Sequence, residues 1–320
     1  MILIGDCIEQ MKTLPAESVH MCVTSPPYWG LRDYGVARQL GLEKTPQEFV
    51  ENMVGVFREV KRVLKNDGTL WLNLGDSYAG SWGNQSRKEH RGKQRAVTKE
   101  QIQDFRPYGN LEGATKTGSR ERTPGLKPKD LVGIPWRVAF ALQADGWYLR
   151  QDIIWHKPNP MPESVTDRCT KAHEYIFLLA KSPKYFFDHE AIKEASAHPH
   201  LAGKMQKVNY SDNTTLRNDG NRVVTRGPTR NKRSVWTVTT KPFRGAHFAT
   251  FPQDLIEPCI LAGSAPGNTV LDPFFGAGTT GLVAKKHGRN YIGIELNPEY
   301  AAIAAARIDA FQVQQELEPA

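Results

Sequence analysis

The sequence has few cysteines and no long hydrophobic run. Its four cysteines are scattered over 320 residues, without the paired spacing of a zinc site or the dense framework of a disulfide-rich secreted domain. They are Cys7, Cys22, Cys169 and Cys259. No apolar stretch approaches the roughly 20 residues of a membrane-spanning helix, and the first residues, MILIGDC, are too short an apolar run for a signal peptide. We therefore expect a reduced, cytoplasmic protein with no metal site and no membrane contact.

Acidic residues are in the minority, and the excess positive charge is concentrated in two stretches. The chain carries 42 Lys+Arg and 34 Asp+Glu, a formal net charge of +8. Residues 81–130 contain 12 basic and 6 acidic side chains, and residues 199–235 contain 8 and 2, so the rest of the chain is acidic overall. Both stretches lack apolar periodicity, so they are either solvated insertions or cationic loops. Clustered Arg and Lys neutralise phosphates, which favours a polyanionic partner.

Outside those stretches, short apolar segments alternate with amphipathic ones. Along residues 46–64, apolar side chains recur at three- and four-residue spacing, which makes one helical stripe. This alternation predicts an α/β protein with a doubly wound, mainly parallel, seven-stranded sheet. The expected strands are Ile2–Ile4, Val19–Thr24, Thr69–Leu74, Leu149–Trp155, Tyr175–Ala180, Thr269–Asp272 and Tyr291–Glu295. The expected helices are Pro46–Leu64, Leu131–Ala144, Gln253–Leu261, Thr279–His287 and Pro298–Phe311.

The stretch TSPPYWG directly follows the apolar run VHMCV, Val19–Val23. Pro26 and Pro27 cannot donate backbone hydrogen bonds, and each disfavours a helical conformation of the residue before it. The chain should therefore leave the strand as a stiff, extended loop with outward carbonyls, the hydroxyl of Ser25 and the ring of Tyr28. A buried Pro-Pro turn packed by aromatic rings is the structural alternative.

A glycine-rich turn lies near the other end of the chain, in DPFFGAGTTG. Gly276, Gly278 and Gly281 satisfy G-x-G-x-x-G between an expected strand and an expected helix, and Glu295 ends the next strand. Glycines let a backbone approach a ligand, and a carboxylate at that strand end can accept hydrogen bonds from ribose hydroxyls. The pattern predicts an adenosine-type ligand. By itself it fits a nicotinamide-dependent oxidoreductase equally well, and a structural tight turn is a further alternative.

Together, TSPPY and DPFFGAGTT closely resemble the S-adenosylmethionine-dependent DNA amino-methyltransferases. The order, with the catalytic motif before the cofactor glycines, is similar to the circularly permuted group called beta. LIGDCIEQMKTLP resembles the family's segment beside the cofactor adenine, and AHFATFPQDLIEPCI resembles its methionine-side segment. An oxidoreductase, or a DNA-binding regulator without catalysis, offers no role for both motifs. The resemblance implies a Rossmann-like methyltransferase fold, S-adenosylmethionine as cofactor and double-stranded DNA as substrate.

The resemblance also implies an organisation and partners. A catalytic domain of residues 1–80, 131–190 and 236–320 would carry a basic DNA-facing insertion, 81–130, and a target-recognition segment, 191–235. A second copy of the chain and a cognate restriction endonuclease are the further partners that it suggests. Because serine rather than aspartate opens the catalytic motif, cytosine N4 is favoured over adenine N6 as the methylated atom.

Residue roles carry over by motif position. Ser25 Oγ and the Pro26 carbonyl would accept the amino hydrogens of a base flipped out of the duplex, Pro27 would stiffen the loop, and Tyr28 would stack on the base. For Asp6, assigned to the adenine amino group, a turn residue is the alternative. The implied cofactor-binding residues are Asp6, Thr24, Phe248, Thr250, Asp272, Phe274, Gly276, Gly278, Thr279, Thr280 and Glu295. The implied DNA-binding arginines are Arg222, Arg226, Arg230 and Arg233.

One dipeptide, Pro258–Cys259, matches the signature of enzymes that methylate carbon 5 of cytosine through a thiolate. Here the cysteine lies in an apolar helical pattern and has no basic neighbour. We therefore expect Cys259 to be a buried core residue and not a nucleophile.

Overall fold

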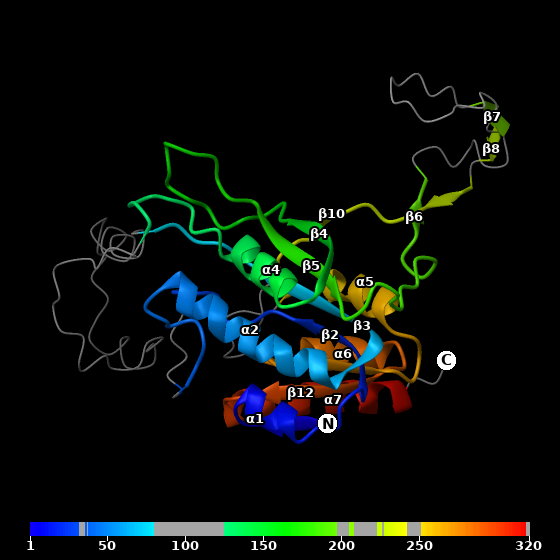
Figure 1. The fold of residues 1–320 in the computed structure, drawn as a ribbon. Helices are drawn as coiled ribbons and strands as arrows, with labels where there is room; N and C mark the ends of the chain where they lie inside the picture. The colour runs from blue at the N-terminus through cyan, green and yellow to red at the C-terminus, as the bar shows by residue number, and fades with distance from the viewer. Residues whose placement is uncertain are drawn as a thin grey trace, which may run out of the picture.

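The computed structural model describes residues 1–31, 36, 38–79, 125–196, 205–207, 223–225, 227–241 and 251–317. Four of the residues singled out above lie outside these ranges, and so does most of the basic stretch 81–130. The four residues are Phe248, Thr250, Arg222 and Arg226. The described chain is built around one central sheet with helices on both of its faces (Figure 1).

The central sheet has eight strands in the described part of the chain, and it is mainly parallel. Only β5 is antiparallel, and it opposes both β3 and β4. In sheet order the strands are β1 (Ile2–Ile4), β12 (Asn290–Glu295), β11 (Thr269–Asp272), β2 (Val19–Thr24), β3 (Leu64–Leu74), β5 (His173–Ala180), β4 (Tyr148–His156) and β10 (Val235–Thr237). The predicted doubly wound, mainly parallel sheet is confirmed, with all seven expected strands.

The eighth strand corrects the predicted count of seven. β10 pairs in parallel with β4, with Trp236 opposite Trp155. It comprises three residues and begins at the last residue of the basic stretch 199–235, and it is too short to show an alternating pattern. Before β10, two short antiparallel ladders stand apart from the central sheet: β6 (Glu194–Ala195) with β9 (Thr229–Arg230), and β7 (Met205–Lys207) with β8 (Val223–Thr225).

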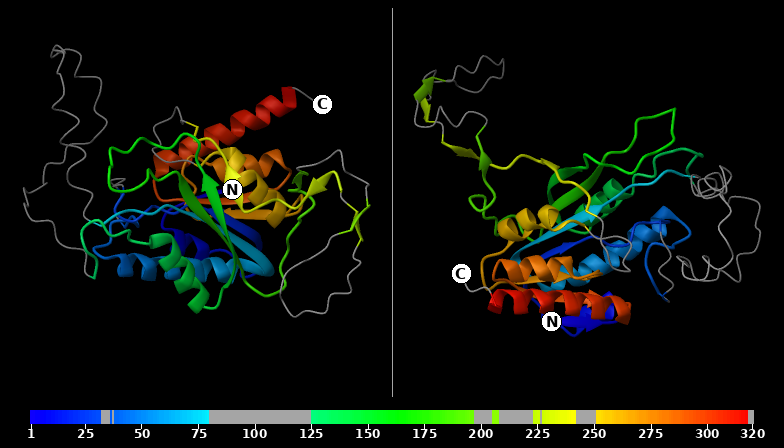
Figure 2. Two further views of the ribbon diagram at one scale, coloured as in Figure 1. Left: turned by 90° about the horizontal axis from the view of Figure 1, so that it is seen from above. Right: turned by 180° about the vertical axis from the view of Figure 1, so that it is seen from behind.

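Six helices of the described chain cover the two faces of the sheet (Figures 1 and 2). On one face lie α1 (Cys7–Lys12), α2 (Pro46–Val63) and α4 (Ile134–Ala144), and on the other lie α5 (Gln253–Gly263), α6 (Thr279–Lys286) and α7 (Pro298–Leu317). The start of α4 differs from the predicted Leu131, because Gly133 has φ +77° and cannot continue a right-handed helix. No helix in the described ranges is long and apolar enough to cross a membrane.

The strands are apolar on both faces because each face is covered. In β2, Met21 and Val23 pack in the core on the side of α5, whereas Cys22 between them packs in the core on the side of α2. This period of two, with helices on both sides, explains why VHMCV is an almost continuous apolar run. Because most strands run in parallel, their carboxyl ends lie at one edge of the sheet. An open α/β sheet binds its ligands at this edge.

Candidate active site

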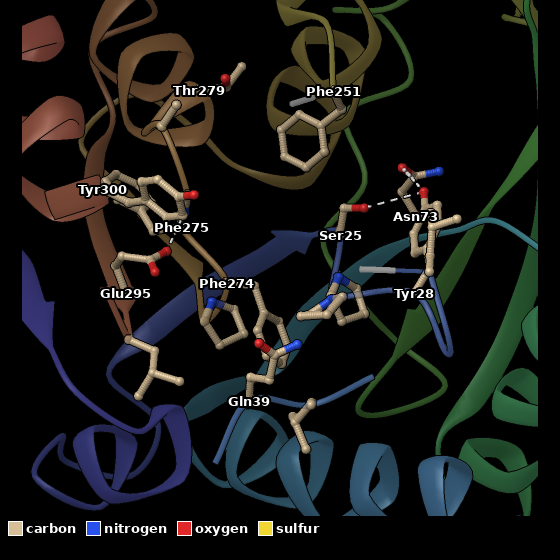
Figure 3. A pocket seen from close by; sticks show the side chains of 18 of the residues that line it. Ser25, Tyr28, Gln39, Asn73, Phe251, Phe274, Phe275, Thr279, Glu295 and Tyr300 are labelled. Carbon is tan, nitrogen blue, oxygen red and sulfur yellow. Dashed lines mark hydrogen bonds between the residues drawn. The ribbon is translucent and has the colours of Figure 1, made fainter. Parts of the chain in front are cut away.

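A cavity of about 830 Å³ opens at this edge of the sheet. Residues from both sequence motifs line it, although most of the chain separates the motifs, and Figure 3 shows these residues on its two sides. One side carries the TSPPY loop and the other carries the end of β12 and the glycine turn after β11. The predicted site residues that line the cavity are Asp6, Ser25, Pro26, Pro27, Tyr28, Phe274, Gly276, Thr279 and Glu295.

Glu295 is held at the wall of the cavity by two backbone amides. Gly276 N donates to Glu295 Oε2 at 2.8 Å, and Asn297 N donates to Oε1 at 2.9 Å. Burial raises the pKa of the Glu295 carboxyl, and these amides oppose that shift because they stabilise the charged form. Each carboxylate oxygen has a second lone pair, so the side chain can still accept hydrogen bonds from two ligand hydroxyls. This donor and acceptor pattern fits a ribose.

Asp6 has a structural contact as well as a place at the cavity. Its Oδ1 accepts hydrogen bonds from Ile8 N at 2.9 Å and Glu9 N at 3.1 Å, and so caps the N-terminus of α1. The cap uses one carboxylate oxygen, which leaves Oδ2 as an acceptor for a donor such as an amino group. Asp6 can therefore cap the helix with one oxygen and accept a hydrogen bond from a ligand amino group with the other.

The three motif glycines serve different purposes. Gly276 borders the cavity and has φ +51°, a conformation that favours glycine. Gly278 precedes α6, and a Cβ there would lie 2.8 Å from Ala304 Cβ on α7. A Cβ at Gly281 would lie 2.7 Å from the ring of Phe275. Gly278 and Gly281 therefore let α6 pack closely, and only Gly276 faces the space that a cofactor would fill.

Three predicted cofactor residues lie beneath the cavity and do not line it. Thr24 Oγ1 donates to Asp272 Oδ1 at 2.6 Å, and Thr280 Oγ1 donates to Asp272 Oδ2 at 2.6 Å. All three side chains are buried, and burial raises the pKa of Asp272 to about 6. Their polar atoms face one another, so the contacts of these side chains with the cofactor stay a prediction. The three side chains join the ends of β2 and β11 to the start of α6.

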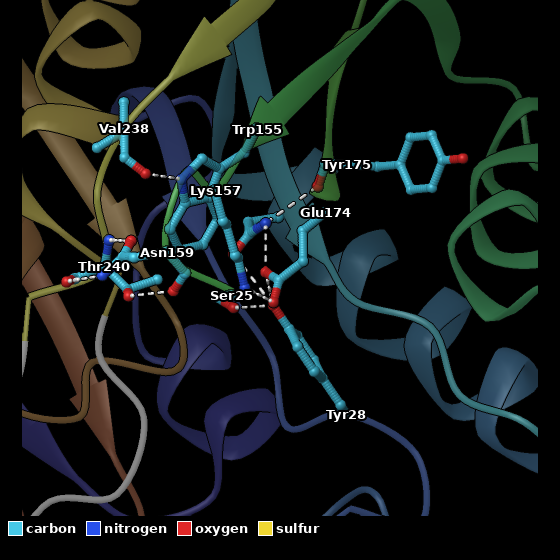
Figure 4. A network of polar contacts seen from close by, with 10 residues as sticks. Ser25, Tyr28, Trp155, Lys157, Asn159, Glu174, Tyr175, Val238 and Thr240 are labelled. Atoms are coloured by element: carbon cyan, nitrogen blue, oxygen red, sulfur yellow. Dashed lines mark hydrogen bonds and ion pairs between the residues drawn. The ribbon is translucent and has the colours of Figure 1, made fainter. Parts of the chain in front are cut away.

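On the opposite side of the cavity, the TSPPY loop is tied into a polar network (Figure 4). Ser25 Oγ lies 3.5 Å from Tyr28 Oη. Tyr28 Oη lies 2.6 Å from Glu174 Oε2 and 3.2 Å from Asn73 Oδ1. The Tyr28 ring packs against Gly75, where a Cβ would come within 2.5 Å of it.

The sequence interpretation missed the residues that complete this network. Lys157 forms an ion pair with Glu174, and the two side chains are only 18% and 15% exposed. The Lys157 ammonium also lies 4.2 Å from the centre of the Trp155 ring. Phe251, just before α5, faces Ser25 across the cavity (Figure 3). The available signal was position, since Asn73, Lys157 and Glu174 lie at the ends of β3, β4 and β5 that meet at the site.

The remaining predictions concern a cysteine and two arginines. Cys259 is buried in α5, its Sγ contacts the Leu255 carbonyl at 3.7 Å, and burial raises its pKa. It does not line the cavity, so the expectation of a core cysteine is confirmed. Arg230 and Arg233 both pair with Glu194, at 2.9 and 2.7 Å. The described residues contain no cluster of metal-ligating side chains.

Comparison with known proteins gives the family. A family model described as DNA methylase, of the N6/N4 type, matches residues 19–306. The Type II methyltransferase M.XycI of Xanthomonas campestris pv. cyanopsidis is 50% identical over 304 residues, covering 95% of this chain and 86% of the relative. The Type II methyltransferase M.Cfr9I of Citrobacter freundii is 48% identical over 305 residues, with the same coverage.

Solved structures share the fold. The PvuII DNA methyltransferase, described as cytosine-N4-specific, has a TM-score of 0.60 at 20% identity and covers 96% of this chain and 85% of its own. The family match excludes the oxidoreductase alternative and confirms the resemblance on which the cofactor was predicted. The chain therefore belongs to the N6/N4 family of DNA methylases, the S-adenosylmethionine-dependent methyltransferases of exocyclic amino groups.

Proposed function

We propose that this enzyme methylates the N4 atom of cytosine at a specific sequence in double-stranded DNA. The observation that carries the proposal is that the Ser25 hydroxyl lies in the same cavity as the Glu295 carboxylate. Serine at the first position of the catalytic motif favours cytosine, and adenine N6 is the alternative target.

The cavity suits the cofactor. Asp6, Phe274, Gly276, Thr279 and Glu295 would hold S-adenosylmethionine, with Glu295 on the ribose hydroxyls. When bound there, the cofactor supplies an activated methyl group. The buried cluster of Thr24, Asp272 and Thr280 keeps the floor of this half of the cavity in place.

The TSPPY loop would activate the acceptor nitrogen. The lone pair of an exocyclic amino group is delocalised into the base, so the nitrogen is a poor nucleophile. Two acceptors that grip its hydrogens in fixed directions make it pyramidal and aim the lone pair at the methyl group. Ser25 Oγ and the Pro26 carbonyl are those acceptors in this proposal, and they act through preorganised electrostatics and positioning.

The target base would have to leave the duplex, because its amino group is otherwise paired. Tyr28 would stack on the flipped base. Residues 191–235 would read the target sequence. Arg230 and Arg233 would release Glu194 and bind DNA in its place. Since the relatives are Type II methyltransferases, the proposal includes a restriction endonuclease of matching specificity. The homodimer suggested by the resemblance stays a prediction, which analytical ultracentrifugation would test.

Nucleoside mass spectrometry tests the choice of base. Unmethylated plasmid is incubated with enzyme and S-adenosylmethionine, digested to nucleosides and compared with a Ser25→Ala reaction. N4-methyldeoxycytidine is the expected product, and Cys259→Ser should form it as well as the unmodified enzyme does. N6-methyldeoxyadenosine alone would overturn the assignment to cytosine. 5-Methyldeoxycytidine, lost in Cys259→Ser, would overturn the proposed amino-group chemistry.

A further inference from the structure

We propose that Glu174 is a positioning residue that sets the direction of the hydrogen bonds around Ser25, so that the Ser25 oxygen can only accept from the substrate. The inference rests on the proposed function, in which Ser25 Oγ accepts an amino hydrogen. A serine hydroxyl is both donor and acceptor. If its own hydrogen pointed at the amino group, two donors would face each other and the nitrogen would not be activated.

The direction of the hydrogen bonds in this network is fixed first at Tyr28. Its hydroxyl has one hydrogen, and in the described part of the chain Glu174 Oε2 at 2.6 Å and Asn73 Oδ1 at 3.2 Å are acceptors near it. A carboxylate has no hydrogen to donate, and the distance of 2.6 Å is that of a charge-assisted hydrogen bond. The single Tyr28 hydrogen is therefore directed at Glu174 and shared at the longer distance with Asn73, so the Tyr28 oxygen has no hydrogen to donate to Ser25.

The orientation of the Asn73 amide is fixed independently. Asn73 Nδ2 lies 3.0 Å from the Tyr175 carbonyl oxygen, which can only accept. Nδ2 also lies 3.3 Å from Glu174 Oε2. Turning the amide over would place two oxygens against each other at Tyr175, so Oδ1 must be the atom that faces Tyr28.

Lys157 fixes the other end of Glu174. Its ammonium group, which can only donate, pairs with Glu174 Oε1. Oε1 therefore receives Lys157, while Oε2 receives Tyr28 and Asn73. Because Lys157, Tyr28 and Asn73 all donate to it, the Glu174 carboxylate has one arrangement in this network (Figure 4).

Ser25 is the last member of the network. Its Oγ lies 3.5 Å from the Tyr28 oxygen, whose single hydrogen is directed at Glu174. Ser25 must therefore donate to Tyr28 when this hydrogen bond forms. Its lone pairs are then the groups that it presents to the cavity, as the activation of an amino group requires.

Steady-state methylation of unmethylated plasmid DNA tests the inference. In Glu174→Gln, Lys157 should hold the amide oxygen of the glutamine. The amide nitrogen then faces Tyr28 and Asn73, so hydrogen-bond donors face one another. We expect kcat to fall roughly tenfold to a hundredfold, at or below the scale for a missing oriented polar group. The KM for DNA and the affinity for S-adenosylhomocysteine should stay within about twofold, because neither depends on hydrogen direction.

Two double variants separate this role from a merely structural one. In Tyr28→Phe, which keeps the ring, the path to Ser25 is already cut, so adding Glu174→Gln should lower kcat no further. Adding Lys157→Met to Glu174→Gln should partly restore kcat, because the glutamine can then turn its oxygen to Tyr28. Full kcat in Glu174→Gln, independent losses with Tyr28→Phe, or no recovery with Lys157→Met would each overturn the inference.

Two further variants serve as controls. Glu163→Gln breaks an ion pair of comparable exposure, with Arg168, in residues that do not line the cavity, and it should keep full kcat. Ser25→Ala separates the proposed function of the Ser25 hydroxyl from the proposed role of Glu174. Full activity in Ser25→Ala would remove the proposed function of that hydroxyl. A loss in Ser25→Ala together with full activity in Glu174→Gln would remove only the role of Glu174.

Discussion

The backbone amide of Gly276 donates a hydrogen bond of 2.8 Å to the carboxylate of Glu295, across 19 residues of sequence. This contact joins the glycine turn after β11 to the end of β12, the two features from which an adenosine-type ligand was predicted. Because the carboxylate is held by backbone amides and not by cations, its negative charge remains available to hydroxyl donors.

Glu295→Ala should weaken S-adenosylhomocysteine binding roughly tenfold to a hundredfold. This corresponds to about 1–3 kcal/mol for lost hydrogen bonds to a charged acceptor. Isothermal titration calorimetry measures the change, and Glu299→Ala, on the exposed start of α7, should leave the affinity unaltered. Equal affinities of Glu295→Ala and the unmodified protein would place the ribose elsewhere.

Gly75→Ala should damage catalysis without affecting cofactor binding. A Cβ at Gly75 would lie 2.5 Å from the Tyr28 ring, so the ring and the hydroxyl network must shift. We expect kcat to fall at least about tenfold, the lower end of what misplaced catalytic groups cost. Gly55→Ala, in α2, is the matched control, because the new Cβ would meet nothing within 4 Å beyond its own stretch of helix, and it should gain up to about 1 kcal/mol of stability. Similar kcat values for both variants would speak against a positioned Tyr28.

Asp272 should make stability depend on pH. Burial raises the pKa of Asp272 from its ordinary 3.8 to about 6, so the folded protein binds this proton more tightly than the unfolded chain does. This contribution to the free energy of unfolding therefore grows as the pH falls through about 6 and levels off below about 4. Between pH 7 and pH 5, the unmodified protein should gain about 1 kcal/mol relative to Asp272→Asn. Urea titrations at both pH values measure it, and identical pH dependence would disprove the assignment.

Arg230 and Arg233 should contribute to sequence preference as well as to affinity. Arginine reads guanine edges bidentately, whereas a contact to phosphate alone is independent of sequence. Replacing both by alanine should lower the slope of log affinity against log salt by about one for each lost phosphate contact and should change which duplexes are preferred. A reduced slope with unchanged preference would assign these residues to the DNA backbone and would place target recognition outside them.

The motifs predicted Ser25 and Glu295 because each combines residue types whose chemistry is specific at that spacing. Ser25 and Glu295 could be expected in one cavity because the carboxyl ends of parallel strands meet at one edge of the sheet. Glu174 and Lys157 could not be found in this way, since single charged residues at strand ends resemble any solvated end. The hydrogen bonds of Asp272 could not be predicted either, because a motif gives the position of a side chain and not the direction in which it points. The direction here is set by Thr24 and Thr280, one of them far away in the sequence.

Single-turnover methylation by Ser25→Ala measures whether the Ser25 hydroxyl activates the amino group of the base. Enzyme in excess over target duplex, with saturating S-adenosylmethionine, isolates methyl transfer from product release. We expect a rate constant roughly tenfold to a thousandfold below that of the unmodified enzyme, a range that extends to the roughly hundredfold to thousandfold scale of one missing oriented polar group, with unchanged affinity for S-adenosylhomocysteine. An unchanged rate constant would contradict this expectation, because the amino group would then be activated without the hydroxyl that TSPPY places in the cavity.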